Sequence, residues 1–306
     1  MNPARRALAL GLCLVLGSCI EDLDRKSLVR YPRVLDIIAE PPEVNPGGTI
    51  TFRVITGGVR ETPTFRWVAC VSPDPTGLPF GTSGFGTASS EVGCFSEAGV
   101  GSVPLGTGET ARFTIPARTL ENIDLLASRF GQRLQEGTLR TLARDVGIVL
   151  GVGVTMETGG TVARAYKRVV VSLSTTPNRN PPPPRFRVGT TLLVPSSERD
   201  RCEPEGGGAL RVRAGQRVAL APDTMEETWF EPFRALTATG DFQDRRESAF
   251  YSWYVTGGSL ARDLTRNPTR NNEWAAPAEP GAYDLWLLVR DGRGGSSGCR
   301  AAVTVE

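Results

Sequence analysis

Histidine is absent from this chain of 306 residues, and its absence removes several kinds of chemistry. No Ser-His-Asp triad, no Cys-His pair and no histidine-ligated metal can be built without it. Lysine is nearly absent too, because only Lys26 and Lys167 stand among many arginines, so Schiff-base or Ser-Lys catalysis has very few candidates. A hydrolase with paired carboxylates is not excluded, yet no spaced Asp/Glu pair at strand ends stands out. We therefore expect a protein that is not an enzyme and that needs no cofactor.

Cysteine is scarce, and neither sign of charge dominates. The six cysteines include no CxxC pair, and without histidine to complete a site we expect no zinc. The acidic residues of Glu198–Glu205 and Asp291 lack the ligand spacing of an EF-hand, so we interpret them as solvated loop charge rather than a metal site. The chain has 35 basic and 33 acidic side chains, and no basic run is interleaved with aromatics, which offers nucleic acid no attractive field.

Long hydrophobic runs are missing as well. The strongest apolar run covers residues 7–16, and these ten residues are too few for a transmembrane helix, which needs about 20. Arg5 and Arg6 precede the run directly, which is the order of a secretory signal that is removed from the mature protein. Its removal leaves 33 basic and 33 acidic groups, so the mature chain is close to neutral.

The apolar run closes with four residues that resemble the bacterial lipobox: Leu16, Gly17, Ser18 and Cys19. The resemblance implies that residues 1–18 are a lipoprotein signal peptide and that Cys19 becomes the acylated first residue, whose two or more acyl chains, palmitate among them, anchor it in a membrane. Ile20 and Glu21 lack the aspartate that often retains a lipoprotein in the inner membrane. The expected location is the outer membrane or cell surface, with the leaflet left open. The alternative is an ordinary signal peptide cleaved near Cys19, which leaves a free thiol.

Removal of Cys13 and lipidation of Cys19 leave an even set of four cysteines, which indicates disulfides in an exported protein. Three pairings are open. We expect the pairs that each lie within one of the two domains proposed below: Cys70 with Cys94, and Cys202 with Cys299.

Four consecutive prolines, Pro181–Pro184, mark the clearest domain boundary. Such a run favours extended polyproline II and acts as a semi-rigid spacer, so residues 177–184 are predicted to be a linker. The linker separates residues 32–176 from residues 185–306, and each span is long enough to build its own core. Residues 19–31 are predicted to be the tether between the lipid and the first domain.

Short β-branched runs bounded by glycine and proline fill both spans and predict an all-β fold of two antiparallel β-sandwiches. Ile50, Phe52 and Val54, for example, alternate with polar residues as in a half-buried strand. The two spans also align with each other, because Trp67 in TFRWVAC matches Trp253 in FYSWYVT. We expect both tryptophans to be core residues.

Most of the mature chain resembles the immunoglobulin-like or PKD-like domains of surface lipoproteins from myxobacteria and their relatives. The resemblance rests on IIAEPPEVNPGGTITFRV with FRWVAC, and on YSWYVTGG through EPGAYDLWLLVRDGRGG. It implies tandem immunoglobulin-like sandwiches with Tyr283 at the tyrosine-corner position and Leu285 where a second cysteine usually stands, so the usual disulfide between strands B and F is missing. Sandwiches of this kind host unrelated functions, which leaves the activity open.

Residues 118–145 show helical periodicity. Apolar residues recur at helical spacing: Leu120, Ile123, Ala127, Phe130 and Leu134. Thr119 can cap the start and Gly137 can end the helix, so we predict an amphipathic helix over residues 119–136, inserted between two strands of the first sandwich. Its apolar stripe is expected to cover a sheet edge, and a partner-binding helix is the alternative.

Two long loops carry whatever specificity the sequence has. Residues 72–111 are rich in glycine and serine and are too long for a mere connection, so they are a functional loop or disordered. Residues 223–249 contain four aromatic residues: Trp229, Phe230, Phe233 and Phe242. Loop aromatics at one end of a sandwich can stack a sugar or anchor a partner, and packing over the core is the other interpretation.

The sequence therefore predicts a non-enzymatic lipoprotein that displays two immunoglobulin-like modules to an unidentified protein or envelope partner. The alternative is an adhesin or carbohydrate-binding protein whose binding platform consists of Trp229, Phe230 and Phe233. Membrane contact is expected through the lipid, and no nucleic-acid partner is expected.

Overall fold

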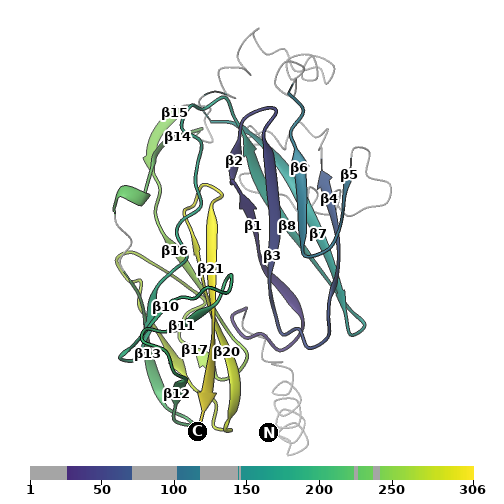
Figure 1. The fold of residues 1–306 in the computed structure, drawn as a ribbon. Helices are drawn as coiled ribbons and strands as arrows, with labels where there is room; N and C mark the ends of the chain where they lie inside the picture. Colours follow the sequence, from purple (N-terminus) through teal and green to yellow (C-terminus); the bar gives the residue numbers. More distant parts are fainter. Residues whose placement is uncertain (1–25, 71–101, 118–143, 145, 224–226, 237–241) are drawn as a thin grey trace, which may run out of the picture.

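The computed structural model describes residues 26–70, 102–117, 144, 146–223, 227–236 and 242–306. Strands dominate these residues, which confirms the all-β prediction. The signal peptide, Cys19, the predicted helix over residues 119–136 and the Cys70–Cys94 pair lie outside what is described. Figure 1 shows the chain as two elongated halves that lie side by side. Within the described part, no helix is long and apolar enough to cross a membrane.

The first half is a β-sandwich of two sheets. One sheet has the order β1 (Arg33–Glu40), β3 (Thr49–Gly57), β6 (Thr110–Thr114). The other has the order β2 (Glu43–Val44), β8 (Thr161–Val171), β7 (Ile148–Thr158), β4 (Thr64–Cys70), β5 (Ser102–Thr107). The apolar core between them includes Phe52, Trp67 and Val154.

The second half is a larger sandwich. Its first sheet has the order β11 (Cys202–Pro204), β10 (Thr191–Pro195), β9 (Phe186–Val188), β13 (Arg217–Pro222), β19 (Asn272–Ala275), β17 (Ser259–Leu260). Its second sheet has the order β12 (Leu210–Val212), β21 (Ser296–Val305), β20 (Gly281–Arg290), β16 (Phe250–Val255), β18 (Leu264–Arg266). A separate hairpin is formed by β14 (Pro232–Leu236) and β15 (Phe242–Arg246), after a 3₁₀ turn, η2 (Glu227–Trp229).

The two sandwiches repeat one topology, which confirms the internal repeat predicted from the sequence. The order β1-β3-β6 recurs as β9-β13-β19, and β2-β8-β7-β4 recurs as β12-β21-β20-β16. In each sandwich the short strand, β2 or β12, pairs in parallel with the last strand. Such a division agrees with the immunoglobulin arrangement, in which strands A, B and E share one sheet and C, F and G the other. Each sheet takes its strands from one side of residues 177–184, and the domain bounds themselves stay a prediction.

Three predicted side chains occupy the positions expected of them. Trp67 and Trp253 are fully buried, and their indole N–H groups donate to the Gly108 carbonyl (2.8 Å) and the Thr265 hydroxyl (2.9 Å). These bonds satisfy the polar end of each ring inside an apolar core. The Tyr283 hydroxyl donates to the carbonyl of the residue four positions earlier at 3.0 Å, which is the tyrosine corner.

Residues 180–182 of the predicted linker make hydrogen bonds to both sandwiches, and the role of the linker as a spacer stays a prediction. The Asn180 side chain donates to the Ala39 carbonyl (2.7 Å) and accepts from the Ser296 N–H (2.9 Å). The Ser297 hydroxyl donates to the Pro182 carbonyl (2.8 Å). Proline lacks an N–H but keeps its carbonyl, so an extended run can still be hydrogen-bonded from both sides.

An apolar cluster joins the sandwiches below the linker. It combines residues from the first half with residues from the second: Val29, Leu35, Ile38 and Ile55 with Trp286 and Leu288. Side chains alternate along a strand, so β1 buries one face in its own core and the other in this junction, and β20 does the same. The two halves are therefore packed as one unit.

Candidate functional site: the hairpin end and the junction

The β14–β15 hairpin is an insertion that the first sandwich lacks. It connects β13 to β16, where the first sandwich joins β3 to β4 through residues 58–63. In immunoglobulin variable domains this B–C connection lies at the binding end. Leu28 pairs with Val255 at the last residue of β16, whereas the hairpin precedes its first residue. The hairpin therefore lies at the far end of β16 from the start of the described chain (Figure 1).

The aromatic residues of this end face different surroundings. Trp229 is 37% exposed, and the guanidinium carbon of Arg179 lies 5.5 Å from its ring centre. Phe230 packs against the core of the second sandwich. Phe233 is half-buried with Arg293 at 5.5 Å from its ring centre. The three rings therefore do not form one continuous platform, and their role in binding stays a prediction.

Phe242 is the second well-exposed aromatic residue of the hairpin end. It is 40% exposed, at the start of β15, and the guanidinium carbon of Arg234 lies 5.0 Å from its ring centre. Arginine over an aromatic face is a cation–π contact that leaves the edge of the ring accessible. The hairpin end thus presents Trp229 and Phe242, each under an arginine.

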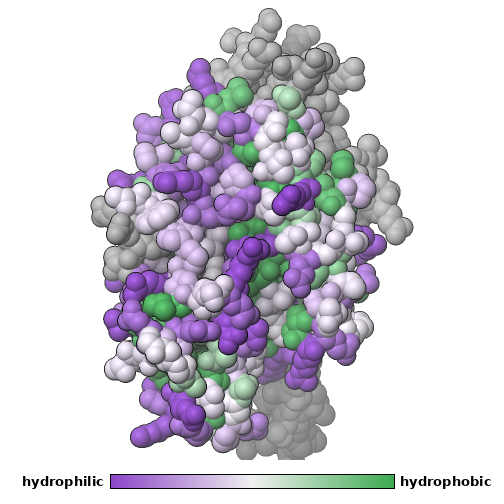
Figure 2. Space-filling view, viewed as in Figure 1, coloured by the Kyte–Doolittle hydropathy of each residue, from purple (hydrophilic) through white to green (hydrophobic). Residues whose placement is uncertain are grey.

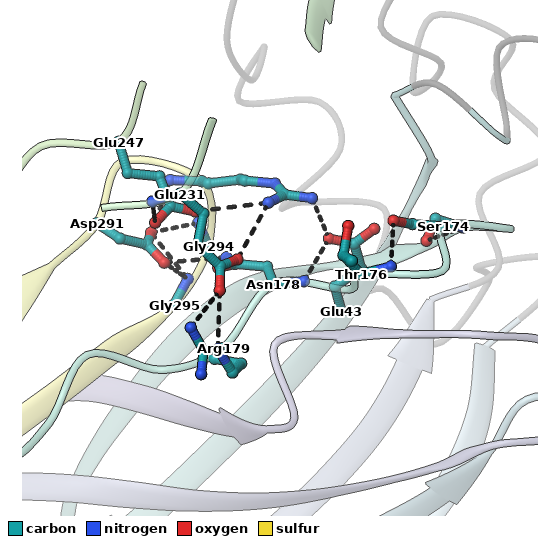
Figure 3. Close-up of polar contacts among 12 residues, drawn as sticks. Glu43, Ser174, Thr176, Asn178, Arg179, Glu231, Glu247, Asp291, Gly294 and Gly295 are labelled. Atoms are coloured by element: carbon teal, nitrogen blue, oxygen red, sulfur yellow. Dashed lines mark hydrogen bonds and ion pairs between the residues drawn. The ribbon is translucent and has the colours of Figure 1, made fainter. Parts of the chain in front are cut away.

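A buried network of charged side chains ties the base of the hairpin to the junction (Figure 3). Arg293, in the turn between β20 and β21, places Nη2 2.5 Å from Glu43 Oε2 in β2. Its Nη1 lies 3.5 Å from Glu247 Oε1 and 3.7 Å from Glu231 Oε2. Arg179 Nε donates to Glu231 Oε1 at 2.7 Å. The network therefore joins both sandwiches, the linker and the hairpin.

Asp291 holds the β20–β21 turn and the linker together. Its carboxylate accepts N–H bonds from Arg293, Gly294 and Gly295, and the Asn178 amide donates to it at 2.9 Å. It is 4% exposed, so the interpretation of Asp291 as solvated loop charge is wrong. Burial raises the pKa of Asp291, and the hydrogen bonds from Asn178 and the backbone oppose that rise.

Glu247 is the most strongly shifted acid of the network. Its pKa is raised from 4.5 to about 7, mainly by burial and also by the nearby charges of Asp291 and Glu231, whereas the Glu231 N–H and Arg293 oppose the rise. Its Oε2 accepts the Glu231 N–H at 3.0 Å, and its buried Oε1 has no hydrogen-bond donor. Glu247 is only 6% exposed.

A second ionic contact crosses the junction beside the apolar cluster. Lys167 in β8 donates to the Ser296 hydroxyl in β21 at 3.0 Å. Burial lowers the pKa of Lys167, and the Asp36 carboxylate opposes this. Arg290 Nη2 in turn lies 3.2 Å from Asp36 Oδ2. The Lys167–Ser296 and Arg290–Asp36 contacts both join one sandwich to the other.

A cleft of about 540 Å³ opens along the seam between the sandwiches. Its walls include Phe65 and Val54 on one side and Arg300 on the other, and Figure 2 shows hydrophobic and strongly hydrophilic residues side by side on this face. Arg53 of the first sandwich donates a hydrogen bond to Asp200 of the second. Burial raises the pKa of Asp200, and the nearby Arg53 cation opposes that rise. The basic and acidic side chains of the lining balance, so the cleft points to no particular ligand.

Sequence reasoning missed the residues at the centre of the junction. Glu43 and Glu247 carry no motif, and Arg293 lies in a glycine-rich turn that is typical of a solvated loop. The available signal was the uninterrupted apolar run LWLLV in β20, because a strand without polar alternation is buried on both faces.

The Cys202–Cys299 pair is a disulfide, as predicted. It joins β11 to β21 with a Cα–Cα distance of 5.6 Å, and it closes a sequence separation of 97 residues. In the part of the chain that the structure describes, no three Cys, Asp or Glu side chains gather in a metal-binding arrangement.

No family model and no curated protein matches the chain. Among solved structures, the two tandem V-type regions of the chitin-binding protein VCBP3 are 13% identical with a TM-score of 0.27, and the match covers 89% of this chain and 99% of that one. The glucan-utilisation protein SGBP-B of Bacteroides ovatus is 11% identical with a TM-score of 0.22 and coverages of 90% and 47%. Escherichia coli alpha-2-macroglobulin is 10% identical with a TM-score of 0.23, and the chain, 92% of which is matched, spans 22% of it. Likenesses at this level add nothing to the topology described above.

Proposed function

We propose that this protein is a non-enzymatic lipoprotein of the outer membrane or cell surface. The acylated Cys19 holds it in the membrane, and two immunoglobulin-like or PKD-like modules present a binding end to a protein or envelope partner. Its mechanism is display and contact, with no bond made or broken.

The observation that carries the proposal is the placement of the two ends of β16. Lys26 follows Cys19 by seven positions, and even a fully extended chain spans only about 25 Å over that distance. The Val255 N–H donates to the Ser27 carbonyl at 2.9 Å, and the Val29 N–H donates to the Val255 carbonyl at 2.8 Å. The last residue of β16 therefore lies beside the residues that directly follow the tether. The six residues of β16 then carry the hairpin about 20 Å farther from that point. An anchor at Cys19 leaves Trp229 and the hairpin facing away from the membrane.

The packed junction supports display because it removes the freedom of the two modules relative to each other. If the linker were flexible, the modules would lose conformational entropy when a partner binds, and this loss would weaken the binding. Here the apolar cluster and the buried ion pairs between the sandwiches already hold one arrangement.

The test is the mass and the location of the protein in its native host, wild type beside Cys19→Ala. The proposal expects a membrane-extracted chain that starts at Cys19 with the added mass of acyl chains, and its loss from the membrane fraction in the variant. Protease treatment of intact cells then reports whether residues 26–306 are outside. An unlipidated wild-type chain in the soluble fraction would overturn the anchor.

Glycan binding is the second candidate, and two separate exposed rings favour it, Trp229 before the hairpin base and Phe242 at the start of β15. Aromatic faces at the end of a sandwich can stack on sugar rings, and neighbouring arginines can hydrogen-bond hydroxyl groups. A glycan array with the soluble chain from residue 20 onward tests it. Binding that is lost in Trp229→Ala but kept in Leu264→Ala, an exposed apolar residue of β18, supports this function, and equal loss in both contradicts it.

A further inference from the structure

The base of the β14–β15 hairpin is closed by two glutamates. Glu231 directly precedes β14, and Glu247 directly follows β15. The Glu247 N–H donates to the Glu231 carbonyl at 3.1 Å, and the Glu231 N–H donates to the Glu247 carboxyl group at 3.0 Å. The Glu247 side chain is therefore part of the hairpin's own closure.

Arg293 connects this base to the first sandwich. It reaches Glu43 of β2 at 2.5 Å, Glu247 at 3.5 Å and Glu231 at 3.7 Å (Figure 3). Glu43 is also held by the Asn178 N–H at 2.8 Å. Movement of the hairpin base away from Arg293 would therefore loosen the link between the hairpin and the junction.

The network has more carboxyl groups than cations. Four acids contribute carboxyl groups to it, namely Glu43, Glu231, Glu247 and Asp291 (Figure 3). The cations that face them are Arg293 and Arg179, with Lys167 acting on Asp291 from β8. An excess of buried negative charge is relieved when one carboxyl group binds a proton.

The hydrogen-bond donors identify which carboxyl group takes that proton. Asp291 accepts from three backbone N–H groups and Asn178, and Glu231 accepts from Arg179. Glu247 Oε1 is buried and makes no hydrogen bond among the described residues, and its ion-pair contact with Arg293 Nη1, at 3.5 Å, is longer than the 2.5 Å contact of Arg293 with Glu43, so its ionised form is the least stabilised of the four. The pKa of about 7 for Glu247, raised mainly by burial, agrees with this assignment.

We propose that Glu247 is a proton-operated latch for the hairpin: with the carboxyl group neutral, the hairpin base is closed against Arg293 and the first sandwich, and with the carboxylate ionised the base opens. Opening lets water solvate the carboxylate and separates it from Glu231 and Asp291. The latch concerns motion of the hairpin itself, so it stands whether or not the hairpin binds the partner proposed above.

The direction of the pH effect follows from the two pKa values. The closed state binds the proton with a pKa of about 7, and in the open state the value returns toward the ordinary 4.5. Between these values the closed state carries the extra proton, so a rise in pH favours opening, and the effect levels off above about pH 7. From pH 5.5 to 8.0 the opening equilibrium constant should increase roughly 30-fold.

Hydrogen exchange measured by mass spectrometry on the full mature chain tests the latch. Protection factors, corrected for the intrinsic pH dependence of exchange, are compared at pH 5.5 and 8.0 for peptides within residues 228–249, with β20 and β21 as internal reference. The expected wild-type result is a roughly 30-fold loss of protection confined to the hairpin. Glu247→Gln, which keeps the neutral shape, should retain high protection at both values.

Asp244→Asn is the matched control, because it removes a carboxyl group from the same hairpin at a position whose side chain is 89% exposed. It should keep the wild-type pH dependence. Equal wild-type protection at both pH values, or a Glu247→Gln variant that follows the wild type, would overturn the latch. A carboxyl-carbon NMR titration of the wild-type protein decides the matter independently of variant stability: a Glu247 midpoint near 7 supports the latch, and one near 4.5 overturns it.

Discussion

Arg293 and Glu43 stand 250 positions apart in the chain and on opposite sandwiches, yet Arg293 Nη2 lies 2.5 Å from Glu43 Oε2. Glu43 is 2% exposed, so this ion pair is removed from water. A pair of this kind contributes little net stability when it is intact, but it is costly to break on one side. It therefore specifies one arrangement of the two sandwiches.

Replacement of Arg293 by methionine should destabilise the protein by about 3 kcal/mol, because it leaves the Glu43 carboxylate buried without its cation. Arg293→Met combined with Glu43→Gln should recover part of the loss. Urea unfolding followed by fluorescence measures both. Arg211→Met, which breaks the exposed pair with Glu306, should change the free energy of unfolding by less than about 1 kcal/mol. Equal effects of the two arginine substitutions would contradict the buried role of Arg293.

The Cys202–Cys299 disulfide should contribute about 4 to 5 kcal/mol in the chain-entropy treatment, because its sequence separation is 97 residues. The double variant Cys202→Ala, Cys299→Ala removes the bond without adding buried polar groups. Its urea midpoint should fall, and reducing agent should lower the wild-type midpoint by a similar amount while leaving the variant unchanged. A midpoint in the variant equal to that of the oxidised wild type would contradict this contribution.

Local patterns predicted the elements that depend on neighbouring residues. Alternating apolar residues predicted the strands, because a half-buried strand repeats every two residues. Trp67 and Trp253 predicted the equivalent core positions of the two sandwiches, and Tyr283 predicted the tyrosine corner. The Cys202–Cys299 bond also followed once the second span was assigned one core.

The junction could not be predicted in the same way, because it depends on residues far apart in sequence. Nothing near Glu43 indicates that Arg293 will reach it, and polyproline propensity describes the conformation of residues 181–184 without saying what packs against them. The aromatic residues were grouped because they are close in sequence. The fold then placed Trp229 at the surface and Phe230 against the core.

Cleavage between the sandwiches should reveal the junction through Trp286. The isolated second span, residues 185–306, has its own core and disulfide, so we expect it to fold, as we expect of residues 26–176. Separation exposes Trp286 and Leu288, which are buried against Ile38 and Ile55 in the whole chain.

The measurement is tryptophan fluorescence of the separate spans and of their mixture. The isolated second span should show red-shifted emission relative to a Trp286→Phe variant of the same span, and mixing with the first span should reverse the shift. Both spans should keep cooperative melting transitions. A second span that shows no transition of its own would contradict the two-domain division at residues 177–184.

The free energy of unfolding should depend on pH through Glu247 in a direction opposite to that of a salt-bridged acid. Its folded-state pKa of about 7 lies above the ordinary 4.5, so between these values the folded state binds the proton and the unfolded chain does not. Stability from this group is therefore greatest at acid pH and falls as pH rises from about 4.5 to about 7, with no further change above that. Asp200 and Asp291 also have raised pKa values, so the wild-type curve alone does not isolate Glu247. The difference between wild type and Glu247→Gln does isolate it: the variant should gain stability relative to wild type as pH rises from 5 to 8. A difference that stays constant across this range would show that Glu247 titrates as an ordinary solvated acid.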